Sequence, residues 1–141
     1  MSKSFESSRA PEPVGAFPHA KRVGTLLFLS GIGPRVRGSK KIPGVTLDSA
    51  GKIVRYDIEA QCRAVFENVR LVLEDAEATW QDIIDVTVFL TNMKKDFSIY
   101  NRLYAEHFAG PGKPNPTRTT VEVTALPTPI AIELKVIASV E

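Results

Sequence analysis

Near its C-terminus the chain reads PTRTTVEVTALP over residues 116–127 and IAIELKV over residues 130–136. Both segments are rich in β-branched residues and a Leu-Pro turn separates them, so they predict two consecutive strands. The first segment contains one arginine, Arg118, and the second contains one acid, Glu133, among apolar residues. Because strand interiors seldom hold a charge without a partner or a function, we interpret both residues as candidate site residues.

The sequence upstream of these strands alternates between strand and helix patterns. Residues 23–31 are apolar and β-favouring and end at Gly31, so they predict a strand. Residues 83–91 alternate Val86, Val88 and Leu90 with more polar positions and predict a second strand. One face of that strand is expected to be apolar and the other mixed.

Two helices are expected between these strands. From Ile58, apolar residues recur with a 3.6-residue period as far as Leu73, and Asp57 is placed to cap the first turn. A second apolar stripe precedes the Gly-Pro-Gly at residues 110–112, with Asp96 as its predicted N-cap. The stripe consists of Phe97, Tyr100, Tyr104, His107 and Phe108.

The order of these elements predicts an α+β domain in which both helices pack on one face of the sheet. The terminal strands supply more apolar surface than two helices would cover, so we expect the chain to self-associate through the other face. The residues on which this expectation depends are Val121, Val123, Ile130, Ile132, Leu134 and Val136.

Length and composition favour one domain without a membrane segment. The 141 residues can bury a single core, and no stretch approaches the roughly twenty apolar residues that span a bilayer. Residues 1–13 are rich in Ser, Glu and Pro and lack the apolar core of a secretory signal. We therefore expect a flexible leader over residues 1–13, a single domain over residues 14–141 and a cytoplasmic location.

The Cys and His residues are too few for a disulfide or a metal site. Cys62 is the single cysteine, and His19 and His107 are the only histidines. None of them falls at metal-ligand spacing. Cys62 lies on the apolar stripe of the first helix, where a small core residue is the simpler interpretation. We expect no metal and no cofactor.

The formal net charge of +2 is too small to favour nucleic acid as a partner. Basic residues nevertheless gather in one Gly- and Pro-containing segment, at Arg35, Arg37, Lys40 and Lys41. Two interpretations of this segment remain open. It is a solvated loop, or it attracts a small anion toward a site.

Taken together, several short motifs resemble the Rid family, the reactive intermediate deaminases also called the YjgF family. They are Leu29-Ser30-Gly31, Glu67-Asn68, residues 86–90, Phe97 with Tyr100-Asn101, and residues 118–123 continuing to Glu133. The resemblance runs almost from end to end. It implies a chorismate-mutase-like fold, with a mixed sheet, two helices on one face and a homotrimer built on the other. The family's pockets lie between neighbouring subunits.

The resemblance also implies roles for individual residues. Arg118 matches the arginine that binds a substrate carboxylate, and Glu133 matches the acid that positions the attacking water. Ser30, Gly31 and Thr120 match positions that line the pocket. Many members have cysteine at the position of Thr120 and tyrosine at the position of Phe17, a further pocket position.

A narrower resemblance concerns residues 15–22 and 116–120, which are similar to the 2-aminomuconate deaminases. It implies hydrolysis of 2-aminomuconate to 4-oxalocrotonate and ammonia, without a metal or cofactor. A substrate with two carboxylates favours a second cation beside Arg118. His19 is the preferred candidate, with Lys21 and Arg22 as alternatives, and Asn92 is a further pocket candidate at a strand end.

Two other functions remain open. A broad deaminase would clear small reactive iminoacids and enamines and would share Arg118. The third possibility is a ligand-binding or RNA-directed protein without catalytic activity, because some relatives are described as ribonucleases or translation inhibitors. Relative rates on small and six-carbon substrates separate the first two. RNA mobility shifts at two salt concentrations test the third.

Overall fold

The computed structural model describes residues 2–141, which form a six-stranded sheet, a separate two-stranded sheet and two long helices. In chain order the elements are β1 (Ser2–Phe5), β2 (Ala20–Val23), β3 (Leu26–Leu29), β4 (Val45–Leu47), β5 (Ile53–Tyr56), α1 (Ile58–Asp75), the 3₁₀ helix η1 (Trp80–Asp82), β6 (Ile83–Leu90), α2 (Met93–Phe108), β7 (Thr117–Glu122) and β8 (Ile132–Ser139).

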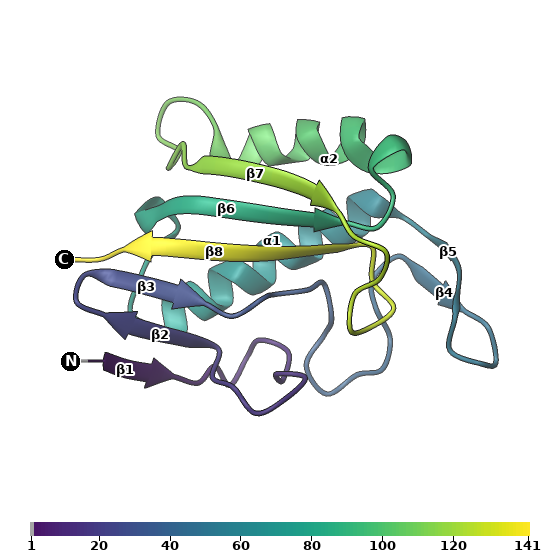
Figure 1. The fold of residues 1–141 in the computed structure, drawn as a ribbon, viewed down its shortest axis with the longest axis horizontal. Helices are drawn as coiled ribbons and strands as arrows, with labels where there is room; N and C mark the ends of the chain where they lie inside the picture. The colour runs from purple at the N-terminus through teal and green to yellow at the C-terminus, as the bar shows by residue number, and fades with distance from the viewer. Residues whose placement is uncertain (1) are drawn as a thin grey trace.

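The large sheet has the strand order β1-β2-β3-β8-β6-β7. Strands β6 and β7 pair in parallel, because α2 connects them as a crossover, and the other neighbouring strands of this sheet pair antiparallel. Figure 1 looks onto the face of the sheet that carries no helix; α1 passes behind the strands, and α2 lies along the β7 edge. The α+β prediction of a mixed sheet with two helices on one face is therefore confirmed.

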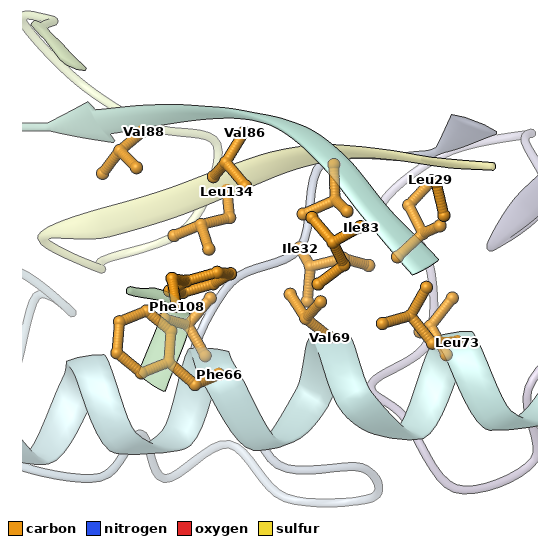
Figure 2. Packing of buried hydrophobic residues seen from close by; sticks show 14 of the residues in the cluster. Leu29, Ile32, Phe66, Val69, Leu73, Ile83, Val86, Val88, Phe108 and Leu134 are labelled. Atoms are coloured by element: carbon orange, nitrogen blue, oxygen red, sulfur yellow. The ribbon is translucent and has the colours of Figure 1, made fainter. Parts of the chain in front are cut away.

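Helix α1 begins where its sequence predicts. The Asp57 side chain accepts hydrogen bonds from the backbone N–H groups of Glu59 and Ala60, which have no partner within the helix. The apolar stripe of α1 packs against the sheet, as Figure 2 shows for Phe66, Val69 and Leu73. This packing makes α1 a rigid support for the loops that contact it.

Helix α2 begins one turn earlier than predicted. Asn92 caps it by accepting a hydrogen bond from the N–H of Lys95 at 3.0 Å. The prediction that Asp96 is the cap is wrong, because Asp96 lies within the helix and is buried. Its carboxylate accepts a hydrogen bond from the Tyr56 hydroxyl at 2.6 Å, which ties β5 to α2.

The face without helices carries apolar side chains, but not the ones that the sequence indicated. Leu134 and Val136 are fully buried on the helix side, and Val121 alone of the expected set is exposed on the open face, at 37%. Neighbouring strands add further apolar residues there, because side chains alternate between the two faces. These are Val23, Leu26, Phe28, Phe89 and Ile137.

The expected flexible leader is part of the fold. Residues 2–5 form β1 and pair with β2, and Phe5 and Ala10 are buried in the core. Arg37 holds the following segment by donating to the carbonyl oxygens of Ser7 and Ala10. The composition of residues 1–13 does not predict this ordered structure, because two buried apolar residues are enough to anchor a short edge segment.

Among residues 2–141, no helix is long and apolar enough to cross a membrane.

Candidate functional site

A pocket of about 170 Å³ lies at the end of the sheet where β3 ends and β8 begins. Its walls come from three segments: residues 11–19, the loop after β3, and the loop before β8, which gather at this end of the sheet (Figure 1). The lining residues are Pro11, Pro13, Val14, Phe17, His19, Ser30, Gly31, Ile32, Gly33, Arg35, Pro127, Thr128, Ile130 and Glu133. Four of the predicted substrate-binding residues are therefore together with Glu133.

Among residues 2–141, Glu133 is the only carboxylate that lines this pocket. It extends from β8 on the open face of the sheet, opposite Phe89 of β6. Partial burial raises the pKa of Glu133, and the nearby positive charge of Arg35 opposes part of that rise. A carboxylate with a raised pKa accepts a proton from water more readily than an exposed carboxylate does.

Gly31 lets the Glu133 carboxylate approach the backbone of the loop after β3. A β-carbon at residue 31 would lie 2.6 Å from Oε2 of Glu133, closer than van der Waals contact allows. The backbone conformation of Gly31 is ordinary, so it is the space and not the torsion angle that requires glycine. Gly31 and Glu133 therefore form one unit of the site.

Replacing Gly31 by alanine should displace the Glu133 carboxylate and leave the fold intact, because only a flexible side-chain end must move. We expect kcat to fall about 10²-fold, the effect of misplacing a reacting group by about 1 Å. Thermal unfolding should stay within a few degrees of wild type. Gly33→Ala is a matched control, since its added carbon would meet Ile130 instead. Equal losses in the two variants would contradict this prediction.

Ser30 and His19 line the pocket, but their polar atoms are engaged in holding its walls. The Ser30 hydroxyl donates to the carbonyl oxygen of Pro18 at 2.7 Å. His19 is buried; its Nδ1 accepts from the N–H of Ser7 at 3.0 Å, and its Nε2 donates to the carbonyl oxygen of Pro11 at 2.8 Å. The prediction that His19 is the second substrate anchor is therefore wrong, because neither ring nitrogen is free.

The cation that faces this pocket is Arg35, which was not predicted as a site residue. Lys21 and Arg22, the other two candidates, lie on β2 and do not line the pocket. The only signal for Arg35 in the sequence was its position in the basic segment after β3. Phe17 lines the pocket and is 43% exposed, and its contact with substrate stays a prediction.

Arg118 forms a second cluster, between the edge strand β7 and helix α2. Its guanidinium lies over the ring of Tyr104, 4.6 Å from the centroid, and its Nη1 donates to Oδ1 of Asn101 at 2.9 Å. Thr120, on the same side of β7, shares a 2.7 Å hydrogen bond with the Tyr100 hydroxyl. Stacking and one hydrogen bond fix the guanidinium and leave its other N–H groups for a ligand.

Arg118 and Glu133 do not meet within one protomer. Arg118 is paired with Val86, whose side chain is buried beneath the helices, whereas Glu133 is paired with Phe89 on the open face. Paired residues share a face, so the two charged groups lie on opposite faces of the sheet. Thr120 belongs to the Arg118 face, and Asn92 is outside both clusters because it caps α2.

Comparisons with known proteins decide the family. The protein-family model described as Endoribonuclease L-PSP matches residues 7–140. A RutC family protein of Pyrococcus horikoshii is 37% identical over 139 residues, which cover 98% of this chain and 98% of that protein. TdcF of Escherichia coli K12, provisionally named a reactive intermediate deaminase, is 31% identical over 138 residues, covering 98% and 97%. The chain belongs to the Rid (YjgF) family.

Solved Rid structures share the fold. YyfA of Yersinia pestis, titled a protein of unknown function of the conserved Rid family, is 34% identical with a TM-score of 0.80, covering 99% of this chain and 100% of that chain. E. coli TdcF with bound serine is 30% identical with a TM-score of 0.83, covering 99% of each chain. The YjgF fold expected from the sequence is confirmed.

Two asparagines of the Rid motifs support the site. Asn68, on the buried face of α1, donates to the carbonyl oxygens of Gly33 and Arg35 at 2.8 and 2.7 Å and fixes the loop after β3. Asn101 orients Arg118 by accepting a hydrogen bond from its Nη1. Among residues 2–141, no group of three or more His, Cys, Asp or Glu residues could hold a metal ion.

Proposed function

We propose that this Rid protein is a deaminase that hydrolyses an enamine or imine carboxylate, and that Arg118 and Glu133 act in sites shared by two subunits. The observation that carries the proposal is the placement of two charged groups on opposite faces of the sheet. On the open face, the half-buried carboxylate of Glu133 lines a preformed pocket. On the other face, Arg118 is oriented by Asn101 and, among residues 2–141, has no carboxylate partner. The deaminase name of TdcF supports the reaction class.

The reaction begins with the imine tautomer of the substrate. Arg118 binds the carboxylate next to the C=N carbon through a two-pronged hydrogen bond, which fixes that carbon relative to water. The imine nitrogen reacts in its protonated form. Glu133 accepts a proton from the water as its oxygen bonds to carbon, and the electron pair of the C=N bond moves to the nitrogen. Glu133 then gives this proton to the resulting amine. As the C–N bond breaks, the hydroxyl group forms the carbonyl and passes its proton to the Glu133 carboxylate, and a 2-oxo acid and ammonia leave.

A shared site explains why the two halves face apart in one protomer. In a closed ring, the edge strand of one subunit lies against the open face of the next, so Arg118 of one chain can enter the Glu133 pocket of its neighbour. The apolar side chains of the open face would be covered by the same association. We propose a homotrimer, the state that the resemblance implies.

We propose 2-aminomuconate as the substrate. Two arginines, Arg118 and Arg35, belong to the two halves of the site, and the pocket wall, which includes Phe17 and Ile130, is largely apolar. Such a site suits an unsaturated six-carbon chain with an acid at each end.

The test is a comparison of steady-state ammonia release from 2-aminomuconate and from the small enamine 2-aminoacrylate, each generated in the assay. We expect kcat/KM to favour the six-carbon diacid by about 10²-fold, because binding of a second carboxylate is lost with the small substrate. A preference for 2-aminoacrylate would identify a broad deaminase instead. Release of ammonia from neither would reject the proposed reaction.

The family model bears the description Endoribonuclease, but the pocket does not favour RNA cleavage. Cleavage without a metal relies on a positioned acid and base. Within the described residues Glu133 is the pocket's one carboxylate, and both ring nitrogens of His19 are bound to backbone groups. The pocket therefore lacks an acid–base pair of that kind.

A further inference from the structure

Arg35 presents unused hydrogen-bond donors to the Glu133 pocket. It is half-buried, and its Nη2 donates to the carbonyl oxygen of Glu12 at 2.6 Å. Among residues 2–141 it takes part in none of the nine ion pairs. A guanidinium has five N–H groups, so most of its donors remain for a ligand.

The fold holds Arg35 in place before any ligand arrives. Asn68 donates one hydrogen bond to the carbonyl oxygen of Arg35 itself and another to that of Gly33. Because Asn68 is on the buried face of α1, the loop is fastened to the core and not only to other loops. A cation supported in this way loses little freedom on binding and gives geometric selectivity.

We infer that Arg35 is a specificity residue that binds the second carboxylate of a dicarboxylate substrate in the Glu133 pocket. The inference rests on the proposed deaminase function, in which Arg118 of the neighbouring subunit binds the first carboxylate. The pocket wall also contains Pro11, Pro13 and Ile130, whose apolar side chains suit the hydrocarbon part of such a molecule. Glu133 stays available for water.

The test measures binding of two stable 2-oxo acids of equal length by isothermal titration calorimetry. 2-Oxoadipate has two carboxylates, and 2-oxohexanoate has one. We expect wild type to prefer the diacid by about 10- to 100-fold, the effect of one hydrogen-bonded charge pair. Arg35→Met keeps the length of the side chain and should abolish this preference, with 2-oxohexanoate binding changed less than about twofold.

Arg37→Met is the matched control. Arg37 holds the same wall by donating to the carbonyl oxygens of Ser7 and Ala10, but it does not line the pocket. It should keep the preference for the diacid. If Arg35→Met weakens both ligands equally, or if Arg37→Met removes the preference as well, Arg35 supports the wall and the inference is wrong.

The outcomes separate this inference from the proposed function. Suppose that the preference for the diacid depends on Arg35 but no enamine releases ammonia. The deaminase proposal would then be rejected, and the dicarboxylate site would be retained. Ammonia release with equal binding of both acids by wild type would retain the deaminase and reject the role of Arg35.

Discussion

Arg118→Ala is expected to lower kcat/KM about 10³-fold, because the variant loses both the binding and the orientation of the substrate carboxylate. The side chain stacks on Tyr104 at a half-exposed edge of β7 and contributes no buried core. The fold and the oligomer should therefore persist. Steady-state ammonia release gives the rate, and light scattering gives the mass of the assembly.

Arg118→Lys separates the two contributions of the guanidinium. Lysine keeps the charge but cannot make the two-pronged hydrogen bond, so we expect it to recover less than about a tenth of the lost activity. Asn101→Ala should give an intermediate loss that appears mainly in KM, since Asn101 orients Arg118 through one hydrogen bond. A variant Arg118→Ala that no longer assembles would show that Arg118 is an interface residue and not a substrate anchor.

The sequence was most informative where one physical pattern determined the structure. The 3.6-residue period and the Asp57 cap defined α1, and the resemblance placed Ser30, Gly31 and Glu133 in one pocket. Local patterns failed where long-range contacts decide. Asp96 looks like a cap, but its bond to Tyr56 depends on β5, forty residues away.

The relative orientation of the two charged strands could not be predicted from the sequence. In β8, Glu133 is out of phase with Ile132 and Leu134, so its face can be inferred. Strand β7 has no apolar alternation that would show which face holds Arg118. The face of Arg118 follows only from its pairing with Val86, which puts Arg118 and Glu133 on opposite faces of the sheet in one chain.

Glu133→Gln is expected to lower kcat about 10²- to 10³-fold with little change in KM, because glutamine cannot accept the proton of the attacking water. Burial raises the pKa of Glu133, and the carboxylate is the active form. The wild-type rate should therefore fall as the pH drops through this raised pKa, and the variant should lack that acid limb. An unchanged kcat, or an acid limb that persists in the variant, would reject the role of Glu133.

Mixing the two inactive variants tests the shared site directly. Suppose that Arg118 and Glu133 act from neighbouring subunits of a trimer. A trimer that contains both Arg118→Ala and Glu133→Gln chains then has one intact site of three, at the single boundary where an unchanged Arg118 meets an unchanged Glu133. This holds whichever variant supplies two of the three chains. Co-expressed chains with different tags, purified on both tags, should therefore recover about a third of the wild-type kcat. Each variant alone should stay inactive. If both residues acted within one chain, no mixture could regain activity, because every chain would lack one of the two groups.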